Sequence, residues 1–213
     1  MLPHRNGVTV TVYQQAQREG QDVVRAAILD TATHLLASEG PAALTVRRIS
    51  GAAGCSTKVI YTLFGGKDGL AEALWLEGFA RFEQRLLSVP GDDPLARLLA
   101  GIAAYRAYAL DEPDYYRVMF QGAVSGFEPG NEAAQAARRT FDLLVTWVQR
   151  CLDDGRLRGA AAVEISDVLW MAMHGAVSLE ISGYFEPEEA EARFRLLWTS
   201  VLHPFLAPDE RIS

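Results

Sequence analysis

Residues 44–67, LTVRRISGAAGCSTKVIYTLFGGK, predict two short amphipathic helices separated by a tight turn. Thr45 is a suitable N-cap for the first helix, because its hydroxyl can accept a hydrogen bond from the free amides of the next turn. Gly54 can adopt the left-handed conformation that a tight turn needs, and Ser56 is a suitable cap for the second helix. Two short helices joined in this way form a helix-turn-helix.

The second of these helices, from Thr57 to about Leu63, has two chemically different sides. At about 100° per residue, one side is apolar and is expected to dock on the neighbouring helices. The other side carries short hydroxyls, one cation and one tyrosine: Thr57, Lys58, Tyr61 and Thr62. These groups suit the major groove of DNA, where base edges present donors, acceptors and the thymine methyl.

An ordinary helical hairpin with a solvated polar face is the alternative for this stretch. Three features argue against it: the capped glycine turn, the small pair Ala52–Ala53, which lets the helices cross closely, and the hydroxyl-rich outer face. A solvated face usually carries Glu and Lys instead. The stretch therefore favours DNA binding.

Upstream, helical periodicity predicts a first helix over about 21–38, which ends at Gly40 with Pro41 just beyond it. Its buried stripe is expected to be Val24, Ile28, Ala32 and Leu35. We interpret residues 1–20 as a flexible N-terminal arm, because the alternating run Val8–Tyr13 has no partner strands.

Downstream, the periodicity predicts six further helices and no convincing strand. The expected spans are about 67–86, 94–110, 113–121, 131–152, 163–181 and 187–206. The fold class is therefore all-α with about nine helices. We expect a helix-turn-helix domain over 21–66 and a helical domain over 67–213.

Composition limits the class of protein. The 213 residues, 49% of them hydrophobic, suffice for a real core, and no run of 18 uncharged apolar residues predicts a membrane span. The first residues lack the pattern of a secretion signal. Cys55 and Cys151 show no metal-like spacing and no disulfide framework, which fits the cytoplasm.

The net charge of −7 is unevenly distributed along the chain. Residues 1–70 hold seven basic and five acidic side chains, a net of +2, whereas the remaining chain holds thirteen basic and twenty-two acidic ones, a net of −9. A mildly basic head on an acidic body suits a protein that touches a few phosphates.

The segments ILDTATHLLASEG, at 28–40, and LTVRRISGAAGCSTKVIYTLFGGKDGL, at 44–70, resemble the DNA-binding domain of the TetR family. The resemblance covers about residues 21–70 and implies a three-helix head, with the helix after Cys55 as the recognition helix. It implies base-facing positions at Ser56, Thr57, Lys58, Val59 and Thr62, and phosphate-facing positions at Thr45, Tyr61 and Lys67. Departures from the family pattern are Cys55, where Val is usual, Gly51, which weakens its helix by about 0.5–1 kcal/mol relative to Ala, and Gly65–Gly66, which is expected to loosen the hinge to the next helix.

The segment WMAMHGAVSLE, at 170–180, resembles the Trp-His-Gly signature of one subgroup of TetR C-terminal domains. In this family the body forms a ligand pocket, for which the sequence offers aromatic and Met residues. The candidates are Tyr105, Tyr108, Met119, Phe120, Trp147, Trp170, Met173 and His174, each with plain core packing as the alternative. For His174 a core histidine bonded to a neighbour is favoured over a ligand anchor, and a metal ligand is disfavoured because no second His or Cys lies at ligand spacing.

The resemblance also implies a homodimer through about residues 163–206. The last helix carries more apolar surface than one flank of a monomer needs, although burial within its own chain explains part of it: Phe194, Leu197, Trp198, Val201, Leu202 and Phe205. A two-fold dimer would match a palindromic operator, with recognition helices about one duplex turn (~34 Å) apart or more.

The sequence therefore indicates a sequence-specific transcriptional regulator. We expect a repressor that a small-molecule effector releases from duplex DNA, with no cofactor and no metal. The alternative is a helical ligand-binding or protein-interaction module with a vestigial helix-turn-helix. An enzyme is disfavoured, since the chain has no P-loop, GxSxG or HExxH motif and no paired carboxylates in a recognisable setting.

Overall fold

The computed structural model describes residues 11–122, 124 and 126–210, and within them the fold is all-α without a strand, as expected. The helices are α1 (Val12–Glu39), α2 (Val46–Ala52), α3 (Thr57–Phe64), α4 (Lys67–Leu87), α5 (Pro94–Asp111), α6 (Pro113–Phe120), α7 (Asn131–Asp153), α8 (Ala162–Ile181) and α9 (Pro187–Leu202). Short 3₁₀ turns follow α1 and α9. Among the described helices, none combines the length and the apolar character needed to cross a bilayer.

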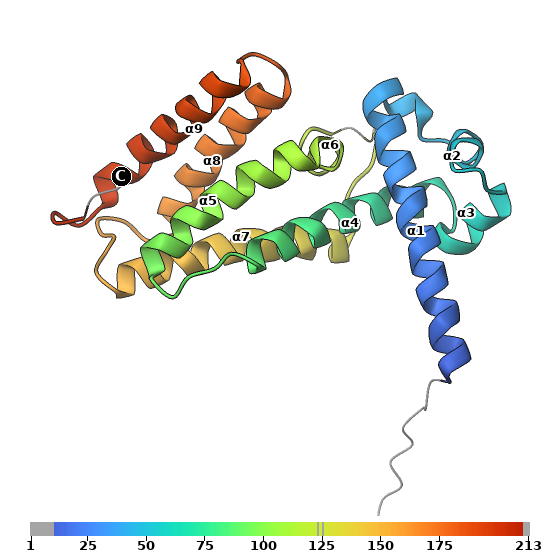
Figure 1. Cartoon of the computed structure of the whole chain (residues 1–213), viewed down its shortest axis with the longest axis horizontal. Coiled ribbons are helices and arrows are strands. Elements are labelled where there is room, and N and C mark those ends of the chain that lie inside the picture. The colour runs from blue at the N-terminus through green and yellow to red at the C-terminus, as the bar shows by residue number, and fades with distance from the viewer. Residues whose placement is uncertain (1–10, 123, 125, 211–213) are drawn as a thin grey trace, which may run out of the picture.

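The start of α1 corrects the sequence interpretation of residues 11–20. The helix begins at Val12, where a capping box holds it: the Thr11 hydroxyl accepts from the Gln14 amide at 3.3 Å, and the Gln14 side chain accepts from the Thr11 amide at 3.1 Å. Good helix formers follow, so Gly20 does not interrupt the helix. The first turns of α1 project from the rest of the molecule with exposed side chains (Figure 1). Residues 1–10 of the predicted arm lie outside the described residues.

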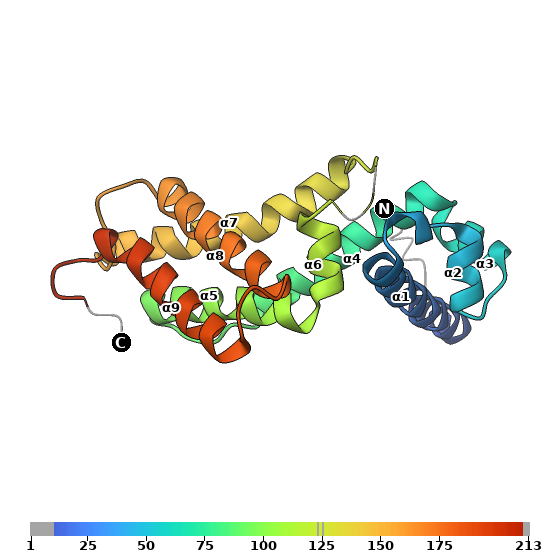
Figure 2. The ribbon, with the colours of Figure 1, turned by 90° about the horizontal axis from the view of Figure 1, so that it is seen from above.

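The helices form a head and an elongated body (Figures 1 and 2). Helices α1–α3 and the first turns of α4 surround the head core, whose fully buried residues include Leu29, Ile49 and Ile60. The body core lies between the rest of α4 and helices α5 and α7–α9. Helix α4 extends from the head into the body, where it packs against α7.

Two of the described helices, α4 and α6, contribute buried residues to both cores. Helix α4 places its first apolar residues in the head and its later ones in the body: Leu70 and Leu74, then Phe79 and Phe82. The two faces of α6 pack into different cores. Tyr115 and Val118 lie in the head core, whereas Tyr116 and Met119 lie in the body core. The predicted boundary at residue 66/67 therefore falls within the head core.

Two glycines allow the body helices to cross closely. A Cβ on Gly78 of α4 would lie 2.8 Å from the Met119 sulfur on α6, and one on Gly101 of α5 would lie 2.2 Å from the Trp147 ring on α7. A side chain at either position would force the neighbouring Met119 or Trp147 side chain to move, since such contacts are closer than real Cβ atoms make.

Candidate DNA-binding surface and ligand cavity

Helix α3 docks on the head through its apolar side. Ile60 is fully buried, Phe64 is buried, and Leu63 packs against the head core while half-buried. The turn before α3 contains Gly54 at φ +66°, and the Cys55 amide donates to the Ser50 carbonyl at 2.9 Å. The predicted helix-turn-helix is therefore present, with its glycine in the left-handed region.

The opposite side of α3 is exposed in the part of the chain that the structure describes. Thr57, Lys58 and Thr62 are exposed, and Tyr61 is 58% exposed. The Thr62 hydroxyl donates to the Lys58 carbonyl at 2.8 Å, so its oxygen keeps lone pairs for an incoming donor. This is the geometry that a recognition helix needs to enter a groove.

The remaining predicted DNA contacts lie around this helix, with one exception. Thr45, Ser56 and Lys67 are exposed, and Thr45 caps α2 by accepting from the Arg48 amide at 3.1 Å. Val59 is half-buried and packs against the head core. Val59 lies at the border between the apolar and the polar side of α3. Part of its side chain therefore packs against the head core and is not available to contact a base.

The joint between α3 and α4 places Lys67 at the start of α4, directly after Gly66, where a Cβ would lie 3.6 Å from the Tyr61 ring. Gly65 (φ +74°) and Gly66 (φ +132°) adopt conformations that other residues rarely adopt. The Gly65 amide donates to the Tyr61 carbonyl at 3.0 Å. Glycine therefore suits both positions of this turn, and a looser hinge to α4 stays a prediction.

A cavity of about 300 Å³ lies inside the body, with residues of α4–α8 in its wall. Five of the eight predicted ligand-binding residues line it: Tyr105, Phe120, Trp147, Trp170 and Met173. Sequence reasoning missed other lining residues, among them Phe82 of α4 and Phe141 of α7. Their apolar pattern resembles that of core residues, so no local signal distinguishes them.

The charged side chains of the cavity wall lie on α7 and α8. Arg138 and Asp167 are exposed residues that line the cavity. Between the same two helices, the ring centroids of Phe141 and Trp170 are 6.0 Å apart. Trp170 is 38% exposed. The cavity is therefore lined largely by aromatic and aliphatic groups and has polar groups toward solvent.

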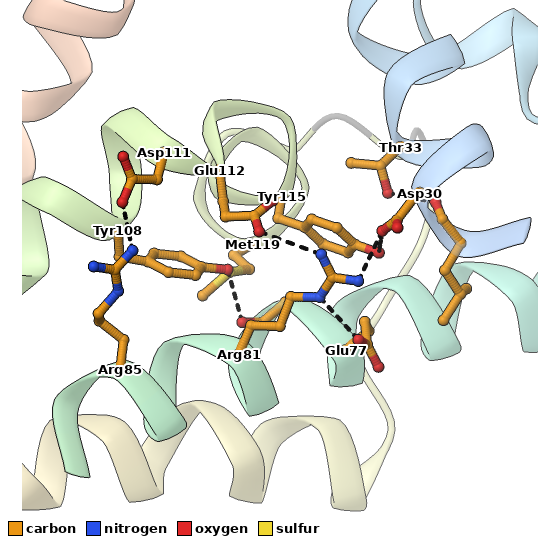
Figure 3. Close-up of polar contacts among 12 residues, drawn as sticks. Asp30, Thr33, Glu77, Arg81, Arg85, Tyr108, Asp111, Glu112, Tyr115 and Met119 are labelled. Carbon is orange, nitrogen blue, oxygen red and sulfur yellow. Dashed lines mark hydrogen bonds and ion pairs between the residues drawn. The ribbon is translucent and has the colours of Figure 1, made fainter. Parts of the chain in front are cut away.

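Tyr108 and Met119 do not line the cavity, which corrects their predicted placement. The Tyr108 hydroxyl donates to the Gly78 carbonyl at 2.8 Å and lies 3.4 Å from the Met119 sulfur. Both side chains fill the junction of α4, α5 and α6 (Figure 3). Tyr108 and Met119 are residue types that often line pockets, but here they lie on helix faces that pack tightly against one another.

His174 is also absent from the cavity wall and lies just behind it. Its Nδ1 is 2.7 Å from the Tyr116 hydroxyl and 3.3 Å from that of Tyr105, and the two hydroxyls are 3.1 Å apart. Burial lowers the pKa of His174, which favours the neutral ring. This is the core histidine bonded to its neighbours that the sequence analysis favoured.

The outer faces of α8 and α9 carry exposed apolar residues. Met171 is 61% exposed, Leu196 is 67% exposed, and Leu197 lines a groove of about 370 Å³ between the two helices. Phe194 and Leu202 are buried within the chain itself. Trp198, Val201 and Phe205 are half-buried against the body core, so own-chain packing accounts for most of the apolar residues expected at the interface, while Leu197 stays exposed beside Leu196.

The fold and these surfaces define a DNA-binding regulator with a helix-turn-helix head and a helical ligand-binding body. Comparison with protein families agrees: residues 28–74 match the bacterial regulatory proteins of the tetR family, and residues 98–201 match the tetracyclin repressor-like C-terminal domain. The chain belongs to the TetR family of transcriptional regulators.

Solved structures share the fold along almost their whole length. The regulatory protein SCO4313 is 26% identical with a TM-score of 0.72, covering 88% of this chain and 98% of its own. A TetR family regulator from Marinobacter aquaeolei is 22% identical with a TM-score of 0.69, covering 86% of this chain and 97% of its own. The TetR family regulator PfmR from Thermus thermophilus is 21% identical with a TM-score of 0.66, covering 86% of this chain and 99% of its own. No curated protein shows a significant sequence match.

Proposed function

We propose that this protein is a repressor that binds a palindromic operator as a homodimer and leaves it when a small-molecule effector binds. The observation that carries the proposal is the exposed row of Thr57, Lys58 and Thr62 on a helix whose other side is docked. A vestigial helix-turn-helix is not expected to retain such a row. The proposal places the protein in the cytoplasm and assigns it a binding role without catalysis.

The exposed groups divide by the part of DNA that they suit. Lys58 can donate to the O6 and N7 atoms of guanine, and the Thr57 and Thr62 methyls can contact thymine. Because the Thr62 hydroxyl already donates within α3, its oxygen suits a base amino group. Ser56 completes the base-facing set, while Thr45, Tyr61 and Lys67 suit phosphates, which position the protein without reading sequence.

The cavity indicates the chemistry of the effector. Its wall is mostly apolar, from Phe82, Ile102 and Trp147 among others, and its charged groups, Arg138 and Asp167, are exposed. Buried ligand sites of this kind bind molecules that are largely apolar and carry a few polar groups. We expect such a molecule, held with its apolar part between α5, α7 and α8.

The outward apolar faces of α8 and α9 support a dimer interface with a second copy of the chain. Met171, Leu196 and Leu197 would be buried there. A two-fold axis through this surface would present both heads to one duplex.

Selection of bound duplexes from a random library tests the proposal. The expected result is an inverted repeat whose half-sites lie about one helical turn (~34 Å) apart or more. Reselection with Thr57→Ala should change the preference at particular base pairs. A pool that binds at low salt without enrichment would support the vestigial module instead.

A further inference from the structure

Helix α6, like α4, contributes side chains both to the cavity wall and to the head core. It has eight residues, from Pro113 to Phe120. Phe120 lines the cavity, and the neighbouring Tyr116 bonds to His174 and Tyr105. One short helix therefore carries both cavity-facing and head-facing side chains.

The other face of α6 reaches α1 through a group of polar contacts that meet at Asp30. The Tyr115 hydroxyl donates to Asp30 Oδ1 at 3.0 Å, and Arg81 Nη2 of α4 donates to the same oxygen at 2.7 Å (Figure 3). We name Asp30, Arg81 and Tyr115 the Asp30 latch. It joins α1 of the head to α4 and α6.

The Arg81 guanidinium lies at the centre of the latch and contacts several of its neighbours. Its Nε donates to Glu77 at 2.8 Å, its Nη1 to Glu112 at 3.3 Å, and its guanidinium lies 4.5 Å from the centre of the Tyr115 ring. The Arg81 side chain is 26% exposed and that of Asp30 is 54% exposed, so solvent partly screens this pair, whereas the Arg81–Glu77 pair is more sheltered. Burial raises the pKa of the Tyr115 hydroxyl, which therefore stays protonated and can donate.

Helix α6 packs closely on α4 at Gly78. A Cβ on Gly78 would lie 2.8 Å from Met119 and 3.3 Å from the Tyr115 ring, so α6 rests directly on the α4 backbone. Because close-packed interfaces shift between discrete arrangements, a molecule that shifts α6 through Phe120 would also shift Tyr115. The distance from Tyr115 to Asp30 would then change.

We propose that the Asp30 latch transmits occupancy of the cavity to the head, with Asp30 and Tyr115 as positioning residues for the recognition helices. The inference rests on the proposed function, since it specifies how the effector would regulate DNA binding. Loss of the latch should leave both binding sites intact and uncouple them. The chemistry is a short-range hydrogen bond and ion pair that a small shift of α6 makes or breaks.

The test uses two latch variants and two matched controls on the full chain. Tyr115→Phe removes one hydroxyl and Asp30→Ala one carboxylate of the latch. Tyr108→Phe removes another buried hydroxyl, which bonds to Gly78, and Asp111→Ala removes the carboxylate that pairs with Arg85, neither of which reaches the head (Figure 3). The probe is 8-anilinonaphthalene-1-sulfonate, an aromatic anion suited to an apolar cavity, and Ala137→Trp fills the cavity to show that the probe binds there.

Two readouts follow probe binding: amide hydrogen exchange of residues 26–36 in α1, and affinity for the selected operator. In the wild type we expect the probe to change the exchange and to shift operator affinity by about 5–150-fold. In Tyr115→Phe and Asp30→Ala we expect no change in α1 exchange and a shift within about twofold, with probe affinity within about twofold of wild type. Both controls should behave as the wild type.

Several results would overturn the inference: latch variants that keep the wild-type shift, controls that lose it equally, or a wild type whose α1 exchange and operator affinity ignore a bound probe. If the probe does not bind, Ala137→Trp replaces it, because its ring occupies the cavity from within, and the same comparison is made with and without Tyr115→Phe. The exchange readout needs no DNA. A chain that selects no operator therefore contradicts the proposed function, whereas one that selects an operator without latch dependence contradicts this inference alone.

Discussion

The carbonyl oxygen of Phe64 and the backbone of Gly69 approach so closely that a Cβ on Gly69 would lie 1.9 Å from that oxygen. Phe64 ends the recognition helix α3, and Gly69 lies in the first turn of α4. The absence of a side chain at residue 69 therefore sets how α3 lies against the helix that connects it to the body.

Gly69→Ala should destabilise the protein by about 1–3 kcal/mol, because the methyl would force α3 and α4 apart. Operator affinity should fall as well, since the recognition helix turns relative to the rest of the head. Urea denaturation and a gel shift measure the two effects. Gly51→Ala is the control: its Cβ would meet open space within α2, so the same substitution should stabilise by about 0.5–1 kcal/mol. Equal effects of the two substitutions would contradict the account.

Lys67→Ala should weaken binding to all duplexes alike and reduce the slope of log affinity against log salt by about one unit. The reason is the position of Lys67 at the start of α4, suited to a phosphate. Lys58→Ala should instead change preference at particular base pairs, at about 1–3 kcal/mol for a bidentate contact. Filter binding over a salt series with several operator variants separates the two, and a change of base preference in Lys67→Ala would refute the assignment.

The free energy of unfolding of the wild type should decrease as the pH is lowered, partly because of His174. Burial lowers the pKa of this ring in the folded state, so below about pH 6.5 the unfolded chain binds a proton that the folded chain resists. The stabilisation from the neutral ring is therefore present above about pH 6.5 and lost as pH falls through the folded pKa. His174→Gln keeps an acceptor for Tyr116 and should show a flatter decline between about pH 7.5 and 5.5 in urea denaturation. Parallel curves for the two proteins would show that His174 does not contribute.

Leu197→Glu should convert the proposed dimer to monomers in sedimentation and weaken operator binding. A carboxylate on the outer face of α9 would be costly to bury against a second copy. Leu87→Glu is the control, because Leu87 is 56% exposed and lies at the end of α4, away from α8 and α9. If Leu197→Glu sediments as the wild type does, the interface lies elsewhere.

The helix-turn-helix was predictable because its determinants are local. The cap at Thr45, the turn at Gly54 and the two sides of α3 follow from residues within one or two helical turns of each other. The start of α1 was also determined locally, by Thr11 and Gln14, but its signal is weak beside an alternating run that suggests a strand. The capping box, and not the alternating run, decides the structure of residues 11–20.

The sequence allowed us to predict which residue types line the cavity, but not which individual residues do. Tyr105 and Tyr108 lie three residues apart on α5, and both are buried, yet Tyr105 lines the cavity while Tyr108 fills the crossing with Gly78. A pattern of apolar residues states that a face is buried without stating which neighbour buries it. The close approaches at Gly78 and Gly101 are equally invisible in a sequence, since they depend on Met119 and Trp147 of other helices.

The amino-acid sequence by itself determined the order of the helices, the docked side of α3 and the free row of Thr57, Lys58 and Thr62, since helical periodicity acts over a few residues. Only the tertiary structure decided that α6 touches both cores and that Asp30, Arg81 and Tyr115 meet. These residues lie far apart along the chain, and their contact depends on how three helices pack together.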